Sequence, residues 1–195
     1  GLQIDPPIFH GPTQDDYVRY FSDISDAVDV GIMIYNTHWY GCPSVSAETM
    51  LNLADAEHVA AIKWGVPEGL DYDDMRKFSQ IFNVIDNSGQ TVRCHKNGGR
   101  GYISALIPAY PQHDLEVWRL LEEGRYEEAQ AKEDLVNNAI GPVGAKIAQR
   151  SGGYRLAKGM MQIVGHSSGP PRQPTLPLND EELAELREAM QSIGW

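Results

Sequence analysis

The sequence predicts an α/β protein in which a parallel sheet is followed by a helical region. Two observations support this prediction. From Leu2 to Ile107, short apolar runs of strand length alternate with amphipathic helical segments, as they do in parallel βα repeats. After Ile107 only helical patterns remain.

The first part of the chain is expected to contain five strands. They are predicted at Leu2–Ile4, Val30–Tyr35, Val59–Ile62, Phe82–Ile85 and Gly101–Ile107. Val30–Tyr35 is a near-continuous apolar run, which suits a parallel strand covered on both faces. Helices are predicted between the strands, at Asp15–Ala27, Ser46–Leu53, Asp71–Phe82 and Thr91–Lys96. Asp71–Phe82 carries aspartates in its first turn, where the helix dipole favours negative charge.

The second part is expected to be helical throughout. Helices are predicted at Asp114–Gly124, Tyr126–Arg150, Tyr154–Val164 and Asp180–Ile193. The pair Gly152-Gly153 and the segment Ser167–Leu178, which contains a proline-rich connector from Gly169 to Pro174, separate them. We therefore expect a β/α domain over residues 1–110 and a helical region over residues 111–195.

Five parallel strands fit either an open, doubly wound sheet or part of a barrel. No Gly-x-Gly-x-x-Gly follows a predicted strand, which weakens the dinucleotide-binding interpretation. A complete eight-stranded barrel takes about 250 residues, more than the 195 residues present. The chain also begins at Gly1, without methionine and inside a predicted strand, so we expect further residues before Gly1.

Composition argues against several partners. The net charge of −11 disfavours binding to nucleic acid, which needs a basic surface. No apolar run is long enough for a membrane span. The two cysteines do not form a disulfide framework and suit a reduced, cytoplasmic location. The histidines lack metal-ligand spacing, so no metal site is expected.

Lys63 is the most informative polar residue. It directly follows the apolar run Val59–Ile62. Burial disfavours the charged amine, which lowers its pKa and makes it nucleophilic, as imine formation with a ketone requires. A lysine just past a strand end can also extend its amine into solvent. The residues alone leave both interpretations open.

Two further polar residues end predicted strands. Tyr35 ends Val30–Tyr35, and the carboxyl ends of parallel strands commonly line active sites. A phenol there can relay protons, although a half-buried tyrosine with a purely structural hydroxyl fits equally well. Asp86 follows Phe82–Ile85 and can either line the site or form a turn.

Taken in order, these segments resemble the dihydrodipicolinate synthase and N-acetylneuraminate lyase family of class I pyruvate aldolases. Ile34-Tyr35-Asn36 and Ile62-Lys63 are similar to its Tyr-Asn and Ile-Lys strand ends, with Tyr35 and Lys63 28 residues apart. The resemblance extends to the Pro7–Pro12 loop, the glycine-rich Gly98–Ser104 segment, Gly124–Ala129 and Arg172-Gln173-Pro174. It therefore covers the chain from about Leu2 to Trp195.

The resemblance implies a (β/α)8 TIM barrel of which only strands four to eight are present, followed by a C-terminal helical subdomain. The partial barrel would occupy residues 1–110. Leu2–Ile4 and Gly101–Ile107 should each have one side open or paired with a segment outside this numbering, and should not pair with each other. The intact protein would be a homo-oligomer, commonly a tetramer.

The resemblance also implies a Schiff-base-forming lyase or aldolase that acts on pyruvate or another 2-oxo acid. Lys63 would form the imine and Tyr35 would shuttle protons, without a cofactor. The expected substrate contacts are Asn36, His38, Trp39, Tyr40, Asp86 and Ile103. Two alternatives remain: a dehydratase of a 3-deoxy-2-oxo sugar acid that uses the same imine, or a catalytically silent family member or fragment.

Three departures from the family pattern bear on the substrate. Tyr40 stands where the synthases have an arginine that binds the carboxylate of the aldehyde substrate. Phe9 replaces a tyrosine that relatives supply from a neighbouring subunit, and Trp64 replaces a common acidic residue. We therefore expect an enzyme that is not a true dihydrodipicolinate synthase and that takes a bulkier or less acidic acceptor.

Overall fold

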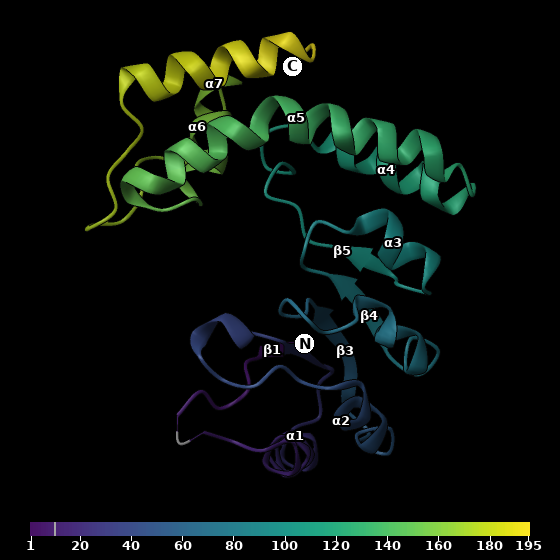
Figure 1. The fold of residues 1–195 in the computed structure, drawn as a ribbon. Coiled ribbons are helices and arrows are strands. Elements are labelled where there is room, and N and C mark those ends of the chain that lie inside the picture. The colour runs from purple at the N-terminus through teal and green to yellow at the C-terminus, as the bar shows by residue number, and fades with distance from the viewer. Residues whose placement is uncertain (10) are drawn as a thin grey trace. The chain divides into compact units, whose positions relative to one another are not determined.

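A computed structural model describes residues 1–9 and 11–195, which form two compact units, Gly1–Ile103 and Ser104–Trp195 (Figure 1). His10, one of the histidines considered for metal binding, lies outside the described residues. In the part of the chain that is described, no helix has the length and apolar character needed to cross a membrane.

The first unit contains a five-stranded parallel sheet. Its strands are β1 (Leu2–Ile4), β2 (Ile32–Tyr35), β3 (Val59–Trp64), β4 (Asn83–Asp86) and β5 (Gly101–Tyr102), and they lie side by side in that order. β1 and β5 are the two edge strands and do not pair with each other within the described residues. The predicted open arrangement of these two strands is confirmed.

The helices of the first unit cover one face of this sheet, as Figure 1 shows for the segments that follow the strands. They are α1 (Gln14–Ala27), α2 (Ala47–Asn52), the 3₁₀ helix η2 (Tyr72–Lys77) and α3 (Thr91–Lys96). Alternate strand residues, among them Ile34, Ile62 and Val84, share a buried core with side chains from each of these helices. Because neighbouring residues of a strand point to opposite faces, Tyr35 and Lys63 point to the other face.

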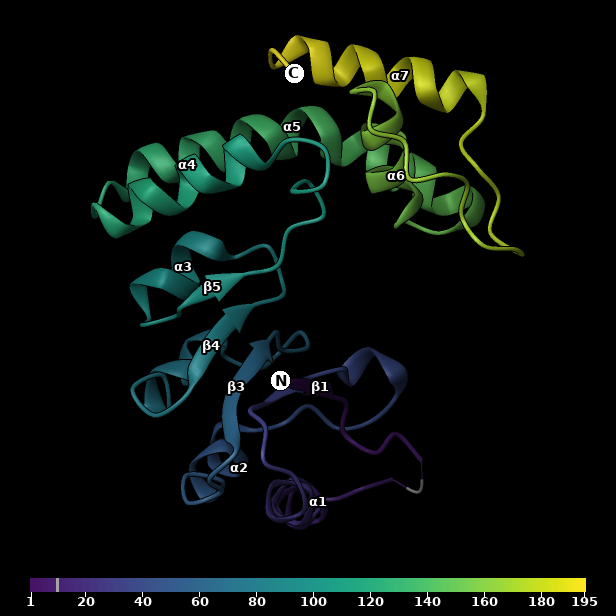
Figure 2. The same ribbon diagram turned by 180° about the vertical axis from the view of Figure 1, so that it is seen from behind.

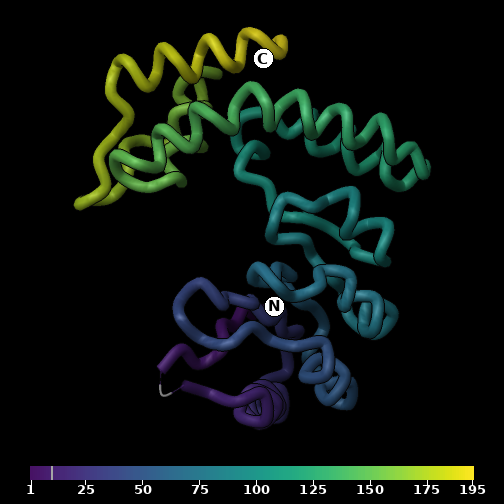
Figure 3. Tube along the Cα trace, viewed as in Figure 1, coloured from purple at the N-terminus to yellow at the C-terminus, as the bar shows by residue number. Residues whose placement is uncertain are grey.

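Sequential strand order with helices on one face is the winding of a β/α barrel. A doubly wound sheet reverses its strand order and carries helices on both faces. Figure 3 traces the chain as it passes from strand to helix and back in each repeat. Of the two architectures that the sequence left open, a doubly wound sheet and part of a barrel, the structure therefore supports the barrel.

Several predicted elements begin or end one to three residues from their bounds in the structure, and two differ more. The helix expected over Asp71–Phe82 is the shorter 3₁₀ helix η2. Tyr72, Met75 and Phe78, spaced three residues apart, are all buried, and a helix of three residues per turn places them on one side. The strand expected over Gly101–Ile107 ends at Tyr102. The next residue makes the last hydrogen bond to β4, from the Ile103 N–H to the Asp86 carbonyl.

The second unit is helical, as predicted, with α4 (Pro111–Glu122), α5 (Tyr126–Ser151), α6 (Arg155–Ile163) and α7 (Asp180–Ser192). Figure 2 shows α4 beside the first half of α5, with α6 and α7 beside its second half. Its core contains Val136, Ile140 and Ile147 of α5 together with Met160, Leu186 and Met190. α5 ends where Gly152 takes a φ of 90°, a conformation that side chains disfavour.

Candidate active site

Lys63 lies near the carboxyl end of β3, in register with Tyr35 of β2. Its side chain is buried, and its Nζ lies 3.5 Å from the centroid of the Tyr35 ring. Burial lowers the pKa of Lys63, while the carboxylate of Asp5 acts in the opposite direction and raises it. The amine is therefore easier to deprotonate than a surface lysine, which increases its nucleophilicity.

Tyr35 contacts both this amine and the loop that follows β2. The loop contains the short 3₁₀ helix η1 (His38–Tyr40). The rings of Tyr35 and Trp39 meet edge to face at 5.5 Å, and Trp39 also contacts the rings of His38 and Tyr40. Trp39 and Tyr40 are 47% and 62% exposed. Three of the predicted substrate contacts thus form one aromatic cluster beside Tyr35.

His38 is the titratable member of that cluster. It is half-buried, and burial lowers its pKa below the usual range of an imidazole. At neutral pH its ring is therefore neutral, so the loop from residue 36 to residue 41 carries no positive charge.

Asn36 is placed differently. Its amide Nδ2 donates to the Gly65 carbonyl at 2.9 Å, and its Oδ1 accepts from the Val45 N–H at 2.9 Å. The side chain is fully buried and lies one residue beyond Tyr35, where a strand side chain points to the helix-covered face. Asn36 therefore links the loop after β2 to the loop after β3 through these hydrogen bonds.

Asp86 is likewise buried on the helix-covered side. Its carboxylate accepts hydrogen bonds from the Tyr72 hydroxyl at 2.8 Å, the Ser88 hydroxyl at 2.9 Å and the Gln90 N–H at 2.8 Å. Burial raises the pKa of Tyr72, so its hydroxyl stays protonated and can donate. The turn interpretation of Asp86 fits this geometry better than a substrate contact.

Ile103 follows β5, and its side chain is 51% exposed. Its place in the sheet is set by the backbone hydrogen bond to Asp86. Two residues earlier, Gly101 is in register with Ile85, and a Cβ at Gly101 would lie 3.2 Å from the Ile85 Cδ1. A larger residue at Gly101, in the same row of the sheet as Lys63, would require the Ile85 side chain to shift by a few tenths of an ångström.

Asp5 is a charged group near Lys63 that no sequence pattern singled out. It lies one residue beyond β1 and acts electrostatically on Lys63. Its signal in the sequence was present but weak: a single acidic residue at a strand end, directly before Pro6 and Pro7.

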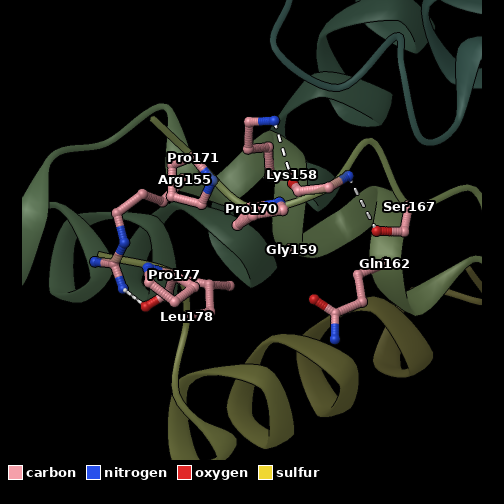
Figure 4. A pocket seen from close by; sticks show the side chains of 10 residues that line it. Arg155, Lys158, Gly159, Gln162, Ser167, Pro170, Pro171, Pro177 and Leu178 are labelled. Atoms are coloured by element: carbon pink, nitrogen blue, oxygen red, sulfur yellow. Dashed lines mark hydrogen bonds between the residues drawn. The ribbon is translucent and has the colours of Figure 1, made fainter. Parts of the chain in front are cut away.

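Among the described residues, no three His, Cys, Asp or Glu side chains gather as metal ligands. Cys42 and Cys94 are free thiols and both are buried. A pocket of about 400 Å³ lies entirely in the second unit, where it is lined by residues of α6 and of the segment from Ser167 to Leu178 (Figure 4). It contains none of the predicted site residues, and the Lys158 amine at its rim is held by the Gly169 carbonyl.

Together, the fold and these residues define the class of protein. It is a β/α barrel in which a buried lysine lies over a tyrosine ring, at the carboxyl ends of two adjacent strands. Within that class, the sequence profile described as the Dihydrodipicolinate synthetase family matches residues 1–193, and the chain belongs to this family.

Relatives and solved structures agree with this assignment. The chain is 24% identical to a 4-hydroxy-tetrahydrodipicolinate synthase of Gluconacetobacter diazotrophicus over 100% of its own length and 65% of that protein. It is 25% identical to the synthase of Desulfotalea psychrophila, covering 96% of this chain and 63% of the relative. The chain thus spans a little less than two thirds of these relatives.

The dihydrodipicolinate synthase of Thermotoga maritima superimposes with a TM-score of 0.81 at 22% identity, covering 100% of this chain and 66% of the other. The enzyme of Acinetobacter baumannii, crystallised with pyruvate, has a TM-score of 0.79 at 19% identity, covering 98% and 65%. The fold is accordingly the part of a TIM barrel from strand four onward, with a helical C-terminal region.

Proposed function

We propose that this chain carries the lysine-bearing part of a Schiff-base-forming lyase or aldolase that acts on pyruvate or another 2-oxo acid. The observation that carries the proposal is the buried Lys63 amine over the Tyr35 ring, in a member of a family of lyases. The pyruvate bound to the Acinetobacter baumannii relative supports the choice of substrate class. By the same resemblance, we propose that the intact protein is a homo-oligomer, a tetramer.

The chemistry begins at Lys63. Its neutral amine attacks the ketone carbon and gives a carbinolamine, which loses water to form a protonated imine. The imine then accepts the electron pair released at the neighbouring carbon, either when a C–C bond breaks or when a proton leaves to form an enamine. The enamine attacks an aldehyde in the synthetic direction. The protonated imine is the electron sink, so the proposed reaction requires no metal or organic cofactor.

The test is reductive trapping. The complete gene product is treated with pyruvate and borohydride, digested and analysed by mass spectrometry. We expect one adduct, on Lys63. A protein that gives no adduct would be catalytically silent, and an adduct on Lys96 or Lys158 would move the nucleophile elsewhere. With a trapped enzyme in hand, product analysis separates an aldolase, which changes a C–C bond, from a dehydratase of a 3-deoxy-2-oxo sugar acid, which breaks a C–O bond.

Tyr35→Phe is expected to lower kcat by about 10²–10⁴, the usual contribution of a positioned acid–base group. The substitution keeps the aromatic face over which the Lys63 amine lies and removes only the hydroxyl that would relay protons. Steady-state kinetics measures the effect, and reductive trapping should still label Lys63, more slowly. Turnover close to that of the unchanged protein would assign the hydroxyl a structural role only.

The second substrate is proposed to be bulkier or less acidic than aspartate semialdehyde. The exposed loop presents the aromatic rings of Trp39 and Tyr40, and it carries no arginine that could bind a carboxylate. We propose that His38, Trp39, Tyr40 and Ile103 contact the acceptor, and that Asn36 and Asp86 hold the loops on which those contacts depend.

Aspartate semialdehyde is therefore expected to be a poor substrate in a coupled assay of dihydrodipicolinate formation. Tyr40→Arg should raise kcat/KM for this aldehyde about tenfold or more, since a hydrogen bond to a charged group contributes about 1.5–3 kcal/mol. Tyr40→Phe is the matched control and should leave it low. Efficient use of aspartate semialdehyde by the unchanged protein would contradict the proposed acceptor.

A further inference from the structure

The register of the sheet aligns Asp5 with Lys63. Ile4 of β1 pairs with Ile34 of β2, so the next residue, Asp5, comes level with Tyr35. Tyr35 in turn pairs with Lys63 of β3. Pro6 follows Asp5, and a residue before proline favours the extended region over the helical one. The strand direction therefore continues through Asp5.

Residues level with one another on neighbouring parallel strands point to the same face of the sheet. Asp5, Tyr35 and Lys63 accordingly form one row on the face opposite the helices, in which the Lys63 amine lies over the Tyr35 ring. The row continues through Ile85 of β4 and Gly101 of β5, which carry no charge. Asp5 is thus the acidic member of the row.

Burial and the Asp5 charge act on the protonation of Lys63 in opposite directions. Burial of Lys63 favours the neutral amine, and the Asp5 carboxylate favours the ammonium. Burial is the larger of the two effects, so the pKa of Lys63 stays below its usual value.

We propose that Asp5 is a positioning residue that shifts the protonation equilibrium of Lys63 toward the ammonium form and thereby adjusts the pH range in which this amine can attack a carbonyl. The importance of Asp5 for catalysis rests on the proposed function, whereas its effect on the protonation of Lys63 does not. Asp5 favours the ammonium form against the larger effect of burial, and attack on a carbonyl requires the neutral amine.

The test measures the titration of Lys63 without any substrate. The complete gene product is labelled briefly with trace acetic anhydride across a series of pH values, and acetylation of the Lys63 peptide is quantified by mass spectrometry. Asp5→Asn removes the charge that raises the pKa of Lys63, so the midpoint should move to lower pH by about one unit, the low end of the shifts caused by nearby charges. Asp5→Glu should retain the original midpoint, because it keeps the charge.

Asp55→Asn is the matched control. Asp55 is exposed and precedes β3 at its amino end, so the substitution removes one negative charge from the same unit without touching the row. It should leave the midpoint unchanged. Asp5→Ser serves as a second neutral variant should Asp5→Asn fold poorly, and high salt should reduce the difference between the unchanged protein and the neutral variants.

A midpoint in Asp5→Asn or Asp5→Ser equal to that of the unchanged protein overturns the proposal. An equal shift in Asp55→Asn overturns it too, because the effect would then be one of net charge. Trapping of pyruvate on Lys63 without any shift in the neutral variants defeats the Asp5 proposal alone. A shift without trapping supports the Asp5 proposal and defeats the proposed function.

Discussion

Lys63→Ala is expected to abolish turnover and to form no borohydride-trapped adduct with pyruvate. The proposed reaction needs a neutral amine, and burial lowers the pKa of Lys63 toward the pH at which such an amine exists. The amine also lies directly over the Tyr35 ring, where a proton relay can act on the carbinolamine. A lysine elsewhere on the surface lacks both conditions.

The fold should survive this substitution, since alanine at Lys63 leaves no buried charge without a counter-charge. Circular dichroism and thermal unfolding measure this directly. Lys96→Ala is the control, because Lys96 is an exposed lysine at the end of α3, and it should keep full activity. Residual turnover of the Lys63→Ala protein within tenfold of the unchanged protein would show that the chemistry does not pass through an imine at this position.

Glu182→Ala is expected to destabilise the second unit by about 3–5 kcal/mol, the usual cost of removing one partner of a buried ion pair. Glu182 Oε2 accepts from Arg155 Nη2 at 2.7 Å, and the side chains of Arg155 and Glu182 are only 1% and 7% exposed. Arg150 binds the same carboxylate through two hydrogen bonds. Without Glu182, the Arg155 guanidinium would stay buried with no counter-charge.

The substitution also removes a helix cap. The Glu182 carboxylate accepts from the Asn179 N–H at the start of α7, while the Asn179 side chain accepts from the Glu182 N–H. One carboxylate thus ties α5, α6 and α7 together. Glu181→Ala is the matched control: Glu181 is 75% exposed and lies 3.6 Å from Lys146, so its loss should change stability by about 0.5 kcal/mol or less. Equal destabilisation by both variants in denaturant unfolding would refute the prediction.

The same network makes the second unit sensitive to acid. Hydrogen bonds from Arg150 contribute most to holding the pKa of Glu182 at about 2, below the usual 4.5. A carboxyl group with a depressed folded-state pKa contributes its full stability above its unfolded pKa. That contribution should therefore be lost as pH falls from about 4.5 to about 2, and the Glu182→Ala protein should lack this part of the acid transition.

Local patterns were sufficient to predict the order of elements. Apolar runs bounded by turn residues located β1 to β4, and helical spacing located α1 and α4 to α7, because both signals depend on residues close together in the chain. The same signals gave the wrong type of helix for Asp71–Phe82. Apolar residues spaced three apart are compatible with an α-helix and with a 3₁₀ helix, and the two are distinguished only by which residues become buried. They also made β5 too long, because an apolar sequence does not show where the neighbouring strand stops pairing.

The site divides in the same way. The sequence determined that Tyr35 and Lys63 end neighbouring strands, and parallel pairing then brings them together. Only the tertiary structure decided that Asn36 and Asp86 point to the helix-covered face and that Asp5 enters the row of Lys63. It also decided that Glu182 meets Arg155, 27 residues away in the chain. The physical reason is that register, the choice of face and burial arise from contacts between segments, and no local run of residues contains that information.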